Sequence, residues 1–248
     1  MLSLAAALSA CGGGGGAAAG GPPGSGAPGG LYVGYYQEDA ANNPEDPVPG
    51  AFSLNLPSGN GSFAGSMYFT YIGCQSSNVG AVSGTKSDLA LSGNWSGTVD
   101  GLAQTGGYGG TYSTATGSYS GTYTNANGKQ LRDLQPCILY SIAALGTWEM
   151  FPVEGRAPAT FNVGISGRNL SWSATPGAAF TLVYLLDPVI AQGTGNPVVW
   201  QTLVGAVTTV AVPNTVSLVS GKEYIAVVGV SNASHQRAAF GSARFTQP

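Results

Sequence analysis

Residues that could perform acid–base or metal chemistry are scarce in this sequence. Its 248 residues include one histidine, three cysteines and 11 Asp or Glu. No Gly-x-Ser-x-Gly motif accompanies His235, so a Ser/His/Asp triad is not indicated and we expect a solvent-exposed loop histidine. A structural zinc site typically uses four Cys or His ligands, which would require every cysteine and the one histidine. We therefore predict no enzyme, no catalytic residues and no cofactor.

The acidic residues offer two weaker possibilities. A cluster that could bind Ca²⁺ through its carboxylates consists of Glu38, Asp39, Glu45 and Asp46. Its spacing fits no EF-hand, so a polar surface loop is the simpler interpretation. Hydrolysis of a glycosidic bond needs two carboxyl groups roughly 5–10 Å apart. The candidates for such a pair are Asp88, Asp100, Glu149 and Glu154.

Aromatic residues are the more promising ligand-binding candidates. Between residues 60 and 124, a unit of an aromatic residue, a small residue, Gly and Ser or Thr recurs. Rings beside hydroxyl and amide side chains could stack on a sugar or a protein if one face of the sheet stays open to solvent. The candidates are Trp95, Tyr108, Tyr112, Tyr119 and Tyr123. The alternative interpretation is that these rings form the core.

The N-terminus contains features of a targeting signal. Residues 1–10 are apolar and end in small residues, which is typical of an export signal. The next residue completes Leu8-Ser9-Ala10-Cys11, which resembles the lipobox of bacterial lipoproteins. The resemblance implies cleavage before Cys11, fatty acylation including palmitate at this residue, and attachment to a Gram-negative envelope. Gly12 implies sorting to the outer membrane, and the short signal without Lys or Arg suggests a start codon further upstream.

A linker and two cysteines agree with this predicted export to the cell envelope. Residues 11–30 hold the acylated Cys and a stretch of Gly, Ala, Pro and Ser alone, which should stay flexible and reach on the order of 25 Å. In an oxidising periplasm, Cys74 and Cys137 should form a disulfide. A free reactive pair is the alternative, although neither residue lies in a Cys-x-x-Cys motif.

Strand-like segments begin at residue 31. The last aromatic units are spaced by 13 and 11 residues, the interval of consecutive hairpin strands. We predict an antiparallel β-meander or small barrel over residues 31–152, with one short helical segment at 129–134 and closing strands at 138–142 and 147–151. Glycines beside the aromatic residues would leave room for rings to lie across the sheet.

Residues 157–248 contain seven short strand-like segments, which predict an immunoglobulin-like β-sandwich. Trp172 and the Leu-x-x-Gly-x-x-Tyr spacing of Leu218–Tyr224 resemble fibronectin type III domains. The resemblance implies a buried Trp172 and a Tyr224 hydroxyl bonded to backbone upstream. Phe180, Leu182 and Tyr184 should line the third strand. The inward-facing residues of the sixth strand should be Ala226, Val228 and Val230.

Composition narrows the functional classes. Charged residues make up 8% of the chain and the net charge is −3, so there is no basic surface for nucleic acid. No apolar run is long enough for a membrane-spanning helix. We expect an all-β, non-enzymatic lipoprotein of the outer membrane that binds an envelope protein or a glycan. The alternatives are a structural accessory subunit of an envelope or secretion complex, and a weak carboxylate-based hydrolase.

Overall fold

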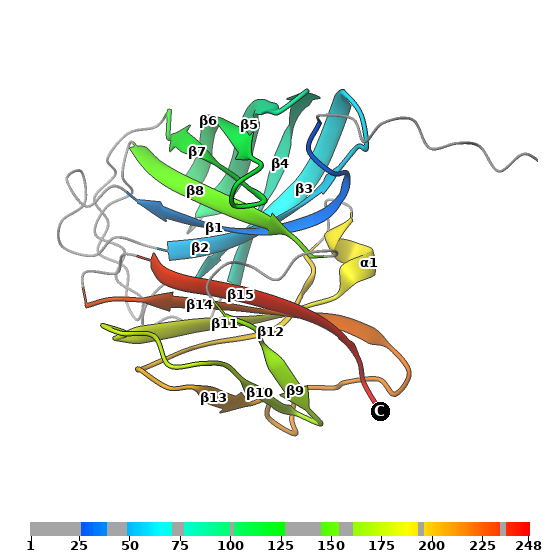
Figure 1. Ribbon diagram of the computed structural model, residues 1–248, viewed down its shortest axis with the longest axis vertical. Coiled ribbons are helices and arrows are strands. Elements are labelled where there is room, and N and C mark those ends of the chain that lie inside the picture. The colour runs from blue at the N-terminus through cyan, green and yellow to red at the C-terminus, as the bar shows by residue number, and fades with distance from the viewer. Residues whose placement is uncertain are drawn as a thin grey trace, which may run out of the picture.

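The computed structural model describes residues 26–38, 49–70, 77–99, 102–126, 145–153, 161–192, 196–233 and 237–248. The first eight strands form a closed antiparallel barrel in chain order (Figure 1). They are β1 (Gly30–Glu38), β2 (Pro49–Leu56), β3 (Gly61–Thr70), β4 (Ser77–Ser87), β5 (Ala90–Val99), β6 (Leu102–Ser113), β7 (Ser118–Thr124) and β8 (Leu145–Pro152). Closure comes from β8 pairing with β1, with Met150 opposite Gly34. Of the two predicted arrangements, the small barrel is therefore confirmed.

Pairs of glycine and aromatic residues allow large rings inside this barrel. Gly34 on β1 lies opposite Phe52 on β2, and Gly50 on β2 lies opposite Tyr36 on β1. In both pairs the ring lies where a Cβ atom of the glycine would be. Among the glycines of the recurring units, Gly110 shows the same relationship to the Trp148 ring, which confirms the prediction there.

The segment before β1 closes one end of the barrel. The Lys86 ammonium group donates hydrogen bonds to the carbonyls of Ala27 (2.7 Å) and Pro57 (2.9 Å). The Tyr32 hydroxyl donates to the Pro28 carbonyl at 2.8 Å. Residues 26–30 were expected to belong to the flexible linker, and this is wrong, because Ala27 is buried and Gly30 begins β1. Composition alone could not reveal the lysine and tyrosine that hold this segment.

The remaining strands form two antiparallel sheets (Figure 1). They are β9 (Gly164–Ser166), β10 (Asn169–Ser171), β11 (Phe180–Leu186), β12 (Val198–Val204), β13 (Thr209–Ala211), β14 (Glu223–Ser231) and β15 (Arg237–Thr246). The sheet orders are β13-β10-β9 and β12-β11-β14-β15. All seven predicted strands are present, although β9 begins three residues later than expected. A one-turn helix, α1 (Pro188–Ala191), follows β11.

Local contacts predicted for this unit are present. The Tyr224 hydroxyl accepts a hydrogen bond from the Val219 backbone N–H at 2.9 Å. Trp172 follows β10 and is buried in the same apolar cluster as Tyr224. Gly221, which lies between Val219 and Tyr224 in the chain, has a φ of +76°, a conformation that favours glycine.

The middle sheet is buried on both faces. Ala226, Val228 and Val230 face the core between the two sheets, as predicted. Leu182 and Tyr184 line β11, but on the opposite face, against the barrel. A strand covered on both sides needs apolar residues at every position, which explains why β11 and β14 are almost continuously buried.

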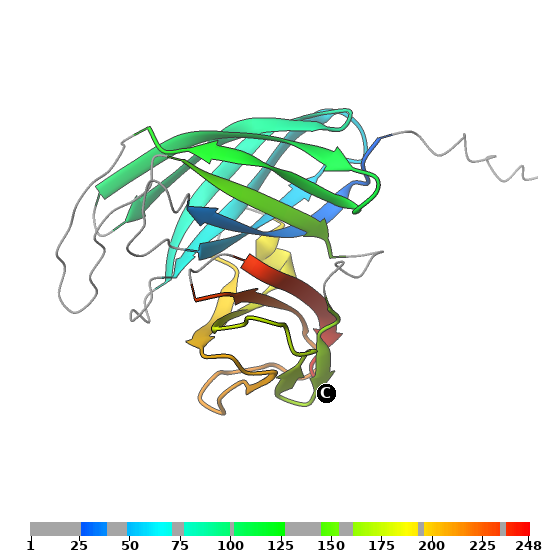
Figure 2. The same ribbon diagram turned by 60° about the vertical axis from the view of Figure 1, so that its left-hand side comes forward.

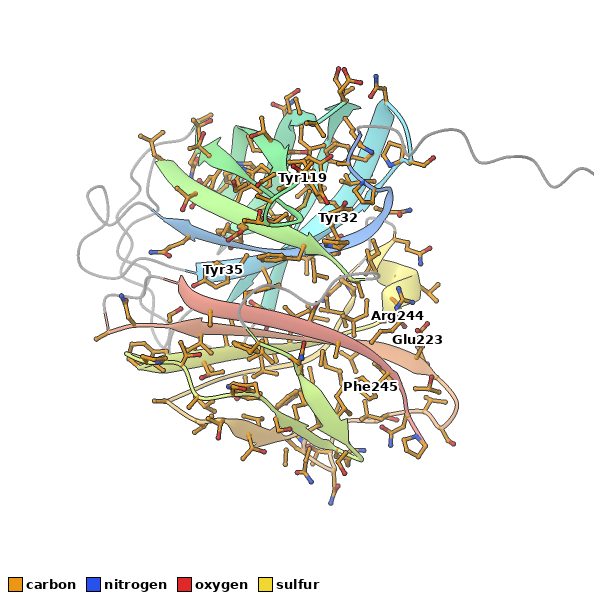
Figure 3. All side chains as sticks on the ribbon, viewed as in Figure 1. Tyr32, Tyr35, Tyr119, Glu223, Arg244 and Phe245 are labelled. Atoms are coloured by element: carbon orange, nitrogen blue, oxygen red, sulfur yellow. The ribbon has the colours of Figure 1, made fainter. Side chains whose placement is uncertain are left out.

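The barrel and the sheets pack into one body (Figure 2). At the junction, the rings of Phe151 and Phe240 stack with centroids 5.3 Å apart. The Tyr35 hydroxyl shares a 2.9 Å hydrogen bond with the Ser231 hydroxyl, and Figure 3 shows Tyr35 directed towards this junction. Ser53 also bonds to the Ala191 carbonyl of α1. Among the described residues, no helix is long and apolar enough to cross a membrane.

Candidate functional site

The five aromatic candidates lie inside the barrel. Three are buried, namely Trp95, Tyr119 and Tyr123, and two are partly buried against them, namely Tyr108 and Tyr112. The expectation of an aromatic face open to solvent is therefore wrong. Because the sheet closes on itself, the face that carries these rings becomes the core, as the alternative interpretation held.

One half of the interior is filled by tyrosines. Tyr119 contacts Tyr32 and Tyr112 edge to face, with ring centroids 5.6 and 5.1 Å apart; Figure 3 shows Tyr32 and Tyr119 within the barrel. Burial, assisted by the neighbouring Tyr112, raises the pKa of Tyr119 to about 12. The pKa of Tyr32 is raised for the same reasons. The Tyr119 hydroxyl has no hydrogen-bond partner among the described residues.

The other half contains an apolar cavity of about 50 Å³. Every strand of the barrel contributes to its lining, which comprises Tyr36, Phe52, Leu54, Met67, Val82, Trp95, Tyr108, Tyr123 and Trp148. A void in a protein core costs about 24 cal/mol per Å³, so this cavity costs on the order of 1 kcal/mol. The recurring aromatic–glycine units signalled these rings but not the space between them.

Polar atoms of the lining rings are bonded to the barrel wall. The Trp95 and Trp148 indole N–H groups donate to the carbonyls of Thr124 (3.0 Å) and Thr122 (3.1 Å). The Tyr108 hydroxyl donates to the Ser83 backbone carbonyl at 3.2 Å. With these donors occupied, the cavity presents mainly carbon, and it could hold an apolar group but could not supply acid–base chemistry.

The outer surface of the same strands is polar. Exposed side chains on β4, β5 and β6 form a hydroxyl wall, defined as Ser83, Thr85, Ser92, Asn94, Ser96 and Thr105. Two shallow depressions adjoin on this wall and share Ser83, Asn94 and Gly107, and no charged residue lines either one. Alternation along each strand places rings inside and small hydroxyl or amide groups outside. The sequence points to the aromatic residues of this segment as binding groups and gives no comparable signal for the wall on the other face.

The described carboxylates lie on separate elements with their own partners. Asp88 sits in the turn after β4, where its side chain and backbone N–H both bond to Asn60. Glu149 on β8 accepts a hydrogen bond from Ser118 at 3.1 Å. In the part of the chain that the structure describes, no three His, Cys, Asp or Glu residues are grouped to hold a metal ion.

Several predicted residues lie outside the described ranges. They are Cys11, Asp39, Glu45, Asp46, Cys74, Asp100, Cys137, Glu154 and His235, together with the helix expected at 129–134 and the strand expected at 138–142. Of the proposed Ca²⁺ cluster, the structure describes the backbone of Glu38 alone, as the last residue of β1. The Cys74–Cys137 disulfide and acylation of Cys11 therefore stay predictions.

No protein-family model, curated protein or solved structure matches this chain. The structure defines the class of architecture. It is an all-β protein with an eight-stranded closed antiparallel barrel followed by antiparallel sheets.

Proposed function

We propose that this chain is a non-enzymatic, lipid-anchored protein of the Gram-negative cell envelope that binds a neutral glycan on the hydroxyl wall of its barrel. The lipobox-like sequence at Cys11 and the Gly-rich linker support the anchor. The described fold begins at the closed end of the barrel, where Ala27 is held by Lys86. The 15 residues from Gly12 to Gly26 would span roughly 20 Å, enough to hold the barrel clear of a membrane surface.

The chemistry of the hydroxyl wall carries the proposal for the ligand. Hydroxyl and amide groups both donate and accept hydrogen bonds, as the hydroxyls of a sugar do. Because both depressions are lined without charge, they offer no ion pair to a phosphate or sulfate group. Neutral glycans are therefore the ligand class that this surface fits best.

A protein partner is the less favoured occupant of the wall. Protein interfaces are centred on buried aromatic or arginine anchors. The six residues of the hydroxyl wall include neither, and the rings that reach its depressions, Phe63, Tyr108 and Trp95, pack in the barrel core. The large apolar side chains exposed among the described residues are Leu145, Val189, Ile190, Val207 and Val219, all outside it. The adjacent Val189 and Ile190 on α1 are the feature that favours the accessory-subunit alternative.

We further propose that the C-terminal unit is a fibronectin type III-like sandwich. Its three-stranded and four-stranded sheets, the buried Trp172 and the Tyr224–Val219 hydrogen bond support this proposal. Since its four-stranded sheet packs on the barrel, the sandwich would act as a support that keeps the wall on the opposite side free.

The test is a binding screen with the full chain carrying Cys11→Ser, which cannot be acylated. The chain is offered neutral glycans, acidic glycans, peptidoglycan and a solubilised envelope extract. Saturable binding to a neutral glycan, together with palmitate incorporation into the unmodified chain but not the Cys11→Ser variant, supports the proposal. One stoichiometric protein partner and no glycan would instead favour the accessory subunit.

A further inference from the structure

We propose that the cavity inside the barrel is a second binding site, one that takes an unbranched alkyl chain. The cavity and the hydroxyl wall lie on opposite faces of the same strands, and Tyr108 and Trp95 contribute to the lining of both. The inference depends on the polarity, rigidity and size of the cavity, and it holds whether or not the wall binds a glycan.

Polarity selects an apolar ligand. The lining consists of aromatic and aliphatic side chains. The indole N–H groups of Trp95 and Trp148 and the hydroxyl of Tyr108 already donate to backbone carbonyls of the barrel strands. A charged or strongly polar guest would lose its hydration without gaining these donors as partners, whereas an alkyl chain needs none.

Rigidity makes the cavity a preformed site. Tyr123 meets Tyr36 and Trp95 edge to face at 5.8 and 6.5 Å, with interplanar angles of 83° and 82°. Gly50 and Gly146 lie opposite Tyr36 and Tyr123, and each ring occupies the space above its glycine. Rings fixed in this way cost a ligand little ordering entropy.

Size selects a slender guest. A cavity of about 50 Å³ has about one third of the roughly 150 Å³ that accommodates benzene in an engineered core cavity of another protein. A six-membered ring is therefore too large, whereas the end of an unbranched chain fits. Single water molecules would find few free polar partners in this lining, so the cavity is not a typical buried-water site.

The closed end and the tyrosine cluster locate the cavity along the barrel. Ala27 and Lys86 close the end at which β1 begins, and the tyrosine cluster around Tyr119 fills the adjoining half. Tyr36 and Tyr123, which line the cavity, lie near the last residues of β1 and β7. The cavity therefore lies on the side of the tyrosine cluster that faces away from the linker.

Calorimetric titration of the full Cys11→Ser chain with 1-octanol tests this site, with cyclooctanol as the probe of equal carbon number. We expect saturable binding of one 1-octanol and at least tenfold weaker binding of cyclooctanol. Val82→Phe should fill the cavity and abolish binding. Val82→Leu, a milder change that should preserve folding, should weaken binding at least fivefold.

The matched control is Val207→Leu, the same substitution at an exposed position of the C-terminal unit, which should bind 1-octanol like the parent chain. Circular dichroism establishes that each variant is folded. The proposal is overturned if 1-octanol shows no saturable binding, if cyclooctanol binds equally well, or if a folded Val82→Leu or Val82→Phe variant keeps the parent affinity.

Discussion

Gly50 on β2 lies directly opposite Tyr36 on β1, and the Tyr36 ring covers the position that a Cβ atom of residue 50 would take. The ring and the glycine therefore form one packing unit, and neither can change alone. The same relationship at Gly34 and Phe52 shows how a narrow barrel accommodates an interior of aromatic residues.

Substitution of this glycine should destabilise the barrel. In Gly50→Ala, the added methyl group must displace the Tyr36 ring, and overpacking of this kind costs about 1–3 kcal/mol. The free energy of unfolding, measured by urea denaturation, should fall by that amount. Gly59→Ala is the control, because a Cβ atom there meets nothing within 4 Å. Equal stability of the two variants would contradict the packing described.

Tyr119→Phe should not destabilise the protein. The Tyr119 hydroxyl is buried without a described partner, so its removal relieves a desolvation penalty of about 1–3 kcal/mol. Tyr32→Phe is the matched comparison, because it removes the hydrogen bond to Pro28 and should cost about 1 kcal/mol. Urea denaturation of the two variants measures both effects. A large fall in the free energy of unfolding for Tyr119→Phe would show that the hydroxyl has a hydrogen-bond partner.

The same tyrosine predicts a response to alkaline pH. An unfolded tyrosine titrates near its ordinary pKa of 10.0, whereas folded Tyr119 titrates at about 12. The folded state therefore binds more protons between these values, and stability falls as the pH rises from 10 to 12. Tyr119→Phe should lose stability less steeply over this interval, and identical slopes would contradict the raised pKa.

Asp187 should stabilise the start of α1. Its carboxylate accepts hydrogen bonds from the N–H groups of Val189 and Ile190 and lies 2.6 Å from the Lys222 ammonium group. Asp187→Ala should cost about 1–2 kcal/mol at neutral pH through loss of the cap. Lys222→Met is the control, since it leaves the cap in place and should cost less.

Acid should remove this stabilisation. Burial alone would raise the pKa of Asp187, but hydrogen bonds from Lys222 and the two backbone groups outweigh burial and hold the pKa below its ordinary 3.8. The stabilisation is therefore complete above pH 3.8 and is lost as the pH falls through the lower pKa of the folded state. Denaturation at pH 7 and at pH 2 should show a smaller difference between parent and Asp187→Ala at the lower pH. An unchanged difference would contradict the lowered pKa.

Phe240→Ala should weaken the barrel and the sandwich together. Phe240 is buried at the junction against Phe151, and removal of a buried Phe costs about 3–5 kcal/mol. Because the junction is continuous with both cores, we expect one unfolding transition. It should shift equally whether it is followed by the fluorescence of the barrel tryptophans or by that of the sandwich tryptophans. Val219→Ala, at an exposed position, should shift neither. A shift confined to the sandwich would show that the two parts unfold independently.

Local patterns were sufficient to predict most strands of this fold. Alternation and turn residues identified β11, β12 and β14 almost to the residue, and the resemblance to fibronectin type III domains implied the backbone hydrogen bond of Tyr224. Closure of the barrel depends on β8 pairing with β1, a contact over more than 100 residues that no local pattern encodes. For this reason the faces of the strands could be assigned, but not which face would become the interior.

The surfaces proposed to bind ligands were harder to predict for the same physical reason. Tyr108 and Tyr123 stood out as binding residues because aromatic rings dominate recognition sites, yet closure turned them inward. Ser83 and Asn94 carry no sequence signal for binding as single residues, and only the barrel brings them together on one wall. Lys86 gave no local sign that it would be buried against Ala27 and Pro57.

The most direct test of the proposed function is titration of the glycan found by the screen against a double variant, Ser83→Ala with Asn94→Ala. Both side chains are exposed on the hydroxyl wall, so folding should be unchanged. Loss of two hydrogen-bonding groups should weaken binding at least tenfold. Thr122→Ala, an exposed hydroxyl on β7 outside the wall, should bind like the parent chain. Parent affinity in the double variant would contradict a glycan site on this wall.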